Sequence, residues 1–294
     1  MVLKRKKRFG DRRDAYWVRD VDGIHTIMGH LMNKRTDAEV FVDYKFDVTE
    51  LMCFLEKRNG SEDPESKTKF MHCIIMAIAK TIDMRPDLNR YVSGRRMYQR
   101  HRISFAFVAR KKFTDDGGES LIITEAEDDW TLRKITDDIY AKVDRVRTGK
   151  DYGIDGLMNK LAKIPRHLLM FLAGIVKILD FYGKTPRAIT DGDPNFATVL
   201  LSNLGSINGP SVYHHLNNYG TNSIVVTLGT VSKTPVVRED RSIDIRDMVD
   251  VGITLDERIA DGFYFARSLK IVQHLLSNPE LLDRPLKESI DFEL

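Results

Sequence analysis

The order in which helical and strand patterns alternate is the feature of this sequence that most constrains its fold. Residues 40–46 alternate between apolar and polar side chains, as a half-buried strand does. Residues 67–86 then form a strongly apolar helical pattern that ends near a proline. Strand patterns return at 95–112 and 119–127. This order predicts an α+β domain in which helices cover a mixed or antiparallel sheet. Further helical patterns cover 23–35, 49–58, 129–149 and 262–278, and further strand patterns cover 196–205, 222–231, 234–240 and 248–257.

Composition narrows the class of protein. The net charge of +3 is small for a chain in which 30% of the residues are charged. The overall charge therefore gives no indication that the protein binds nucleic acid or a membrane. Cys53 and Cys73 lie in helical stretches and are predicted to be buried thiols in a reducing compartment. The longest uninterrupted apolar run, Leu168–Val176, is too short to span a membrane, so the cytoplasm is the default location. No Cys/His cluster has metal-ligand spacing, and no glycine-rich phosphate loop or G-x-S-x-G motif precedes a helix.

Two segments stand apart from this pattern. Residues 1–20 begin with a basic run, Lys4–Arg13, which is read as a solvated tail or as a binder of an anionic partner. Residues 151–190 hold one helix, or two broken at Pro165, that is apolar on nearly every side from Leu168 to Tyr182. Three interpretations of this unit stay open: core, a contact between subunits, or a helix at a membrane surface. Lys177 and Asp180 would lie on its wet face.

Four stretches in order resemble one known family. "YKFDVTEL" (44–51), "RPDLNRYV" (85–92), "LLSNLGSING" (200–209) and the segment that begins "DERIADG" (256–282) are similar to motifs of the dihydrolipoyl acyltransferase component of 2-oxoacid dehydrogenase complexes. The resemblance is to that component's catalytic domain, and it implies the chloramphenicol acetyltransferase-like fold, with one domain over 21–294.

The resemblance also implies partners and substrates. Members of the family form homotrimers, in some cases assembled into cubic shells, with active sites between subunits. Their substrates are coenzyme A or acyl-CoA and an acyl-carrier thiol, and no metal is needed. The sequence departs from the family in four ways. The strand pattern "SLIITEAE" (120–127) lacks the proline-containing pattern of the family at that place. No lipoyl domain is recognised upstream, so no lipoyl attachment is expected on this chain, residues 151–190 form an insertion, and Glu257 stands at the position of the catalytic histidine.

Glu257 changes the expected chemistry. A thiol has a pKa of about 8.5, against about 6.5 for a histidine and about 4.3 for a glutamate. Proton transfer from a thiol to an unperturbed glutamate is therefore uphill by ~3 kcal/mol more than transfer to an unperturbed histidine. That difference corresponds to a rate factor of roughly a hundred. The substitution disfavours the usual thiol chemistry without excluding acyl transfer.

The remaining candidate site residues take their roles from the resemblance. Ser202 matches a serine whose hydroxyl faces the oxyanion, although it also reads as a turn-forming serine with Asn203 and Gly205. Asn203 and Ser206 are nearby alternatives for the same role. His214 and His215 follow that turn and could supply the missing base, or could simply pack in a loop.

Asp261 is expected to hold the 256–262 loop, paired with Arg35 or Arg258, because a buried carboxylate needs a partner. Two functions follow from these residues. One is a coenzyme-A-linked acyltransferase with an atypical base, and the other is a non-catalytic oligomeric scaffold of the same fold.

Overall fold

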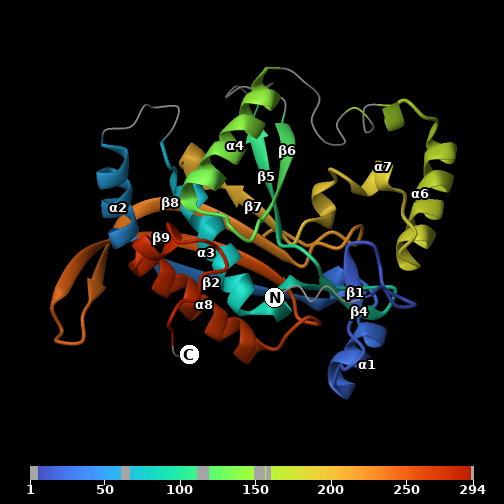
Figure 1. Ribbon diagram of the computed structural model, residues 1–294, viewed down its shortest axis with the longest axis horizontal. Coiled ribbons are helices and arrows are strands. Elements are labelled where there is room, and N and C mark those ends of the chain that lie inside the picture. The colour runs from blue at the N-terminus through green and yellow to red at the C-terminus, as the bar shows by residue number, and fades with distance from the viewer. Residues whose placement is uncertain (1–5, 61–66, 111–118, 149–155, 157–159, 293–294) are drawn as a thin grey trace.

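The structure is a computed structural model, and it describes all residues except 1–5, 61–66, 111–118, 149–155, 157–159 and 293–294. Its main sheet has six strands in the order β2-β9-β8-β7-β5-β6 (Figure 1). The short strand β7 runs parallel to both of its neighbours, and the other pairs are antiparallel, so the mixed sheet is confirmed. The strands are β2 (Glu39–Asp47), β5 (Ser104–Arg110), β6 (Glu119–Glu125), β7 (Val199–Asn203), β8 (Ile224–Val237) and β9 (Ile243–Asp256).

A second, three-stranded antiparallel sheet joins the N-terminal segment to the body of the protein. Its order is β1-β4-β3, with β1 (Ala15–Trp17), β3 (Arg90–Ser93) and β4 (Arg96–Arg100). Part of the predicted basic tail is thus folded, and Arg12 just before β1 is only 7% exposed. The stretch 95–112, expected to be one strand, is divided between β4 and β5, which belong to different sheets.

Helices cover one face of the main sheet and enclose the core. The apolar stretch 67–86 forms α3 (Phe70–Met84), which packs against α8 (Gly262–Ser277) and α4 (Leu132–Arg147). Inward-facing residues of β8 and β9 such as Val226 and Ile253 belong to the same buried cluster. α2 (Thr49–Asn59) adds Leu51 and Leu55 to that cluster but leaves Cys53 exposed, so the prediction that both cysteines are buried is wrong for Cys53.

Three helices lie at the end of the molecule that carries the small sheet (Figure 1). They are α1 (Gly23–Leu31), α6 (Arg166–Phe181) and α7 (Arg187–Thr190). α6 begins directly after Pro165, where a break was predicted, and has no buried residue. The interpretation of this segment as core is therefore wrong. Asp180 does not lie on a wet face either, because its side chain is 14% exposed and faces Arg12.

Candidate functional site

Asp256, the last residue of β9, is the centre of a buried charge cluster. Its side chain is 0% exposed, and its two carboxylate oxygens accept hydrogen bonds from Nε and Nη2 of Arg258 at 2.7 Å each. Arg35 lies close by, with its Nε 3.8 Å from Asp256 Oδ2. Burial lowers the pKa of Arg35 to about 10, Asp256 acts to raise it, and Arg258 lowers it further. The cluster fixes the chain at the end of β9, because separating a buried carboxylate from its cations costs a large free energy.

The loop after Asp256 holds Glu257 by its backbone and leaves its side chain half-buried. The Glu257 N–H donates to the carbonyl of Ala38 at 3.0 Å, and Arg258 Nη1 donates to the carbonyl of Met32 at 2.8 Å. Among the hydrogen bonds of the described residues, none engages the Glu257 carboxylate. The side chain is therefore positioned but open to a partner from outside this chain.

Asp261 has a different role from the one predicted. It is exposed and forms the N-cap of α8, where its side chain accepts a hydrogen bond from the backbone N–H of Tyr264 at 2.7 Å. The prediction that Asp261 pairs with Arg35 or Arg258 is wrong, because both guanidiniums face the fully buried Asp256. Asp261 still holds the loop, but by starting the helix that follows it.

Ser202 lies on β7 and is half-buried. Its neighbours on β7, Val199 and Leu201, belong to the helix-covered core, so the alternation of the strand turns Ser202 to the other face. The turn after it depends on Gly205, since a Cβ there would lie 2.3 Å from a backbone oxygen of Gly229. Ser206 donates its hydroxyl hydrogen bond to the carbonyl of Asn203 at 2.8 Å and so serves the turn.

The two histidines lie on a segment that crosses the same open face of the sheet. We call residues 209–220 the strap. Val212 of the strap donates its N–H to Thr227 Oγ1 on β8 at 3.2 Å, and a Cβ at Gly252 of β9 would lie 2.4 Å from the Val212 carbonyl oxygen. Further along, the ring of Tyr213 lies 5.5 Å from that of Phe41 on β2. The strap therefore runs from the middle of the sheet towards its β2 edge.

His214 and His215 are exposed on this strap. Their rings stack with centroids 4.7 Å apart, and His214 Nδ1 lies 2.8 Å from the carbonyl oxygen of His215. The next residue, Leu216, is buried and donates its N–H to the carboxylate of Glu39, the residue in register with Asp256. The strap thus brings the histidine pair towards the end of the sheet where Glu257 lies.

Strand register separates Ser202 from Glu257 within one chain. Ser202 pairs with Thr227, which pairs with Gly252 of β9. Asp256 lies four positions beyond Gly252, ~14 Å along the strand, and β9 lies two strand spacings, ~10 Å, from β7. Among the described residues no hydrogen bond links Ser202, His214, His215 or Glu257 to one another. A site that uses both Ser202 and Glu257 needs a second chain.

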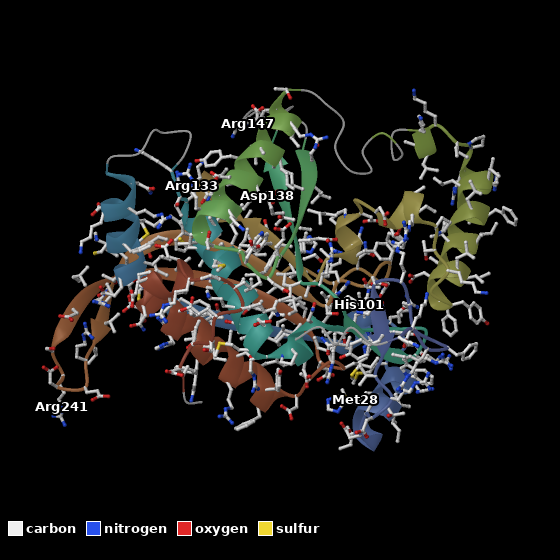
Figure 2. All side chains as sticks on the ribbon, viewed as in Figure 1. Met28, His101, Arg133, Asp138, Arg147 and Arg241 are labelled. Atoms are coloured by element: carbon white, nitrogen blue, oxygen red, sulfur yellow. The ribbon has the colours of Figure 1, made fainter. Side chains whose placement is uncertain are left out.

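A polar cavity of about 980 Å³ lies between the N-terminal segment and the insertion. His101 lines it and is labelled in Figure 2. Two of its arginines are paired, Arg13 with Asp191 at 2.7 Å and Arg102 with Glu125 at 2.6 Å. Its basic lining residues are Arg12, Arg13, Arg100, Arg102, Lys184 and Arg187.

Two cations of this cavity are available to an anionic group. Among the residues that the structure describes, no carboxylate lies within 4.0 Å of the charged nitrogens of Lys184 or Arg187. Arg100 is 5% exposed and donates to backbone carbonyls of Phe196 and Thr221. Arg100 Nη1 also lies 3.8 Å from Asp14 Oδ2. The other acidic residues that line the cavity are Glu125, Asp180, Asp191 and Asp193. The cavity therefore carries charges of both signs.

The described ranges contain neither a candidate metal centre nor a candidate membrane span. No group of three or more His, Cys, Asp or Glu side chains there could hold a metal ion. No helix there is both long and apolar enough to cross a bilayer.

Neither the buried residue that holds the 256–262 loop nor the path of the strap was identified from the sequence. Asp256 opens the "DERIADG" motif, yet the structural role was assigned to Asp261. A signal for the strap was present, because Gly229 and Gly252 interrupt strand patterns, and a glycine inside a strand often marks the close approach of another backbone.

Comparison with known proteins gives a family match over most of the chain. The sequence model of the family described as 2-oxoacid dehydrogenases acyltransferase (catalytic domain) matches residues 19–150 and 187–283. A curated relative, the lipoamide acyltransferase component of the branched-chain alpha-keto acid dehydrogenase complex of Bacillus subtilis, is 23% identical over 266 residues, which cover 88% of this chain and 51% of the relative. The chain thus spans about half the length of that relative.

Solved structures support the fold. The dihydrolipoamide acetyltransferase of Azotobacter vinelandii superposes with a TM-score of 0.61 at 16% identity, covering 90% of this chain and 93% of that one. The cubic core of a pyruvate dehydrogenase multienzyme complex gives the same TM-score of 0.61, also at 16% identity and with the same coverage of 90% and 93%. The predicted chloramphenicol acetyltransferase-like fold is confirmed by this likeness.

Proposed function

Because the chain belongs to the 2-oxoacid dehydrogenase acyltransferase family, we propose that it is a coenzyme-A-linked acyltransferase in which Glu257 takes the place of the family's catalytic histidine. The family-like unit is residues 21–294, with residues 151–190 inserted and residues 1–20 as a basic extension. The observation that carries the proposal is the loop 256–262. It is held by the Asp256 cluster at one end and the Asp261 cap at the other, with the Glu257 carboxylate free between them.

The proposed reaction moves an acyl group from the sulfur of coenzyme A to an acceptor. A base removes the acceptor's proton, the acceptor attacks the thioester carbonyl, and a tetrahedral oxyanion forms. The hydroxyl of Ser202 donates a hydrogen bond to that oxyanion. As the intermediate collapses, the carbon–sulfur bond breaks and the thiolate takes the proton from the base. Glu257, His214 or His215 is that base.

The proposed site lies between two chains. Two strand spacings across the sheet and four positions along β9 place Ser202 ~17 Å from Asp256 in one chain, beyond the reach of a shared hydrogen-bond network. A homotrimer, as in the family, would bring the Ser202 turn of one chain against the 256–262 loop of its neighbour. The exposed positions of His214 and His215 suit a contact with that neighbour.

The proposal is tested first with a panel of acyl-CoA thioesters, measuring release of the free coenzyme A thiol. Ser202→Ala is expected to lower kcat by about 100-fold or more, as loss of an oxyanion donor does. Glu257→Gln, His214→Gln and His215→Gln identify the base, because only loss of the base removes the rise of the rate with pH on the acid side of the pH–rate profile. Absence of both turnover and acyl-CoA binding in the unaltered protein would end the enzyme proposal.

A mixing experiment tests the two-chain site. Ser202→Ala and Glu257→Gln chains are each nearly inactive, but a trimer assembled from both contains some interfaces with an intact Ser202 and an intact Glu257. Random assembly of equal amounts restores about a quarter of the sites, because each site needs one specific chain on each side. No recovery on mixing would contradict a shared site.

The alternative function is a non-catalytic oligomeric scaffold. The observation that favours it is Glu257 itself, since an unperturbed glutamate is a poor proton acceptor for a thiol. The scaffold reading predicts that Glu257→Gln and Ser202→Ala leave both the assembly and every acyl-CoA measurement unchanged.

A further inference from the structure

The helix α6 presents an apolar surface that the other described residues cover only in part, since Leu172, Val176 and Leu179 are half-buried and the other apolar side chains are exposed. None of its 16 residues is buried, and in Figure 2 its side chains extend into open space on the side away from the sheet. The exposed fractions are large for apolar side chains: Phe171 is 65% exposed, Ile178 61% and Tyr182, at the end of the helix, 69%. The family model leaves residues 151–186 unmatched, so this surface lies outside the part of the chain that the family match covers.

The apolar side chains occupy one half of the helix circumference. Successive residues of a helix are turned by about 100°, so positions can be ordered by angle around the helix axis. In that order nine apolar residues occupy an arc of ~180° that begins at Ile178 and ends at Leu169. The opposite side carries Arg166 and Lys177, with Ala173 next to Arg166. Met170 and Phe181 are the exceptions on that side. The apolar residues of the wide arc are Leu168, Leu169, Phe171, Leu172, Ile175, Val176, Ile178, Leu179 and Tyr182.

The region around α6 is strongly basic. Residues 160–187 contain six Lys or Arg residues and one acidic residue, Asp180, so their formal charge is +5. Asp180 is engaged by Arg12, with Asp180 Oδ1 3.7 Å from the guanidinium. The neighbouring N-terminal segment adds exposed basic residues at 6–8, and Phe9 beside them is 92% exposed.

The foot of α6 is fixed to the body, so the helix is held out in a defined direction. Arg12 donates to the carbonyl oxygens of Asp180 at 2.6 Å and Phe181 at 3.3 Å, at the C-terminal end of the helix. The backbone of Phe181 lies against Gly94 in the β3–β4 turn, where a Cβ would lie 2.2 Å from the Phe181 carbonyl oxygen.

We propose that α6 lies in the plane of an anionic lipid surface, with its apolar arc among the acyl chains and its basic residues at the headgroups. A half-apolar helix flanked by Lys and Arg has the composition of interfacial helices. Each basic residue near an anionic leaflet adds further attraction. The helix is an in-plane element and does not cross the bilayer.

A second copy of the chain fits this surface less well. Leu168, Phe171, Ile175 and Ile178 follow the three-four spacing of a coiled-coil seam. However, the apolar arc is much wider than such a seam, and the flanking positions, which include Leu172 and Leu179, carry no charges to pair with a partner. Two copies would also bring together two segments of the same +5 charge.

The test is co-flotation of the full chain with lipid vesicles. Vesicles of phosphatidylcholine alone are compared with vesicles containing about 30% phosphatidylglycerol, at low and high salt. We expect binding to the anionic vesicles that weakens with salt. Phe171→Gln combined with Ile178→Gln should lower the partition coefficient by at least about tenfold.

The matched control removes no apolar-arc residue. Met170→Gln combined with Ala173→Gln lies on the opposite side of the same helix, is equally free of charge change, and should bind within about twofold of the unaltered chain. All four positions are exposed, so folding is preserved in both variants. Three results would overturn the proposal: no flotation of the unaltered chain, equal losses in the two variants, or a lower molecular mass by light scattering of the Phe171/Ile178 variant without lipid. The last result would make the surface a contact between copies.

Discussion

Replacing Asp256 with asparagine would remove the carboxylate at the centre of the buried cluster and leave two guanidiniums, Arg35 and Arg258, without their counter-charge. Asp256 is 0% exposed, and the two arginines are 5% and 2% exposed, so water cannot replace the lost partner. Removing one member of a buried ion pair costs ~3–5 kcal/mol. At roughly 2–4 °C per kcal/mol for a domain of this size, the thermal midpoint should fall by roughly 6–20 °C. Circular dichroism on heating, with urea titration alongside, measures the loss.

Asp250→Asn is the matched control for this change. Asp250 lies on β9 six residues before Asp256 and so faces the same side of the sheet. It pairs with Lys45 at 3.1 Å, but the two side chains are 45% and 48% exposed. An exposed pair contributes ~0–1 kcal/mol, so the midpoint should move by less than ~4 °C. If both variants shift equally, burial does not strengthen the Asp256 cluster, and the account of the 256–262 loop fails.

Three further predictions concern single side chains. Asp261→Ala should lower the free energy of unfolding by ~0.5–2 kcal/mol through loss of the α8 cap, whereas Asp261→Asn should retain most of it, as urea titration would show. Burial lowers the pKa of His72 to about 4, so as the pH falls this histidine is protonated in the unfolded chain before it is protonated in the folded one. Stability should therefore fall as pH drops from about 6.5 towards 4, by ~1.4 kcal/mol per unit, and a His72→Gln variant should lack that part of the slope. Burial raises the pKa of Cys73 to about 12, so a thiol reagent should modify only Cys53 in the native protein and both cysteines in urea.

The long elements could be predicted because their apolar periodicity extends over many residues. The pattern at 67–86 became α3 and that at 262–278 became α8, within a few residues at each end. The outer halves of β8 and β9 were divided or missed, since side chains such as Val237 and Ile243 are 69% and 67% exposed and follow no core pattern. Where no face is buried, alternation carries no information about a strand.

The error at Cys53 shows how periodicity could have been used further. Leu51 and Leu55 are four residues apart and share the buried face of α2. Cys53 lies halfway between them, which places it about 200° round the helix from each. An apolar composition was read as burial of every residue, although the spacing itself pointed Cys53 outwards.

The candidate site was harder to predict because its members are related by strand register and not by sequence distance. His214 and His215 follow the Ser202 turn closely in the sequence, which suggested a base for that serine. The strap instead crosses β8 and β9 and carries the histidines towards β2. Its path depends on contacts that are far apart in the chain, such as the close approach of Val212 to Gly252. Ser202, His214 and His215 are close in the sequence, but the register of the strands decides which side chains lie close in space. Within one chain that register keeps Ser202 and Glu257 apart, so a site that uses both side chains requires two chains.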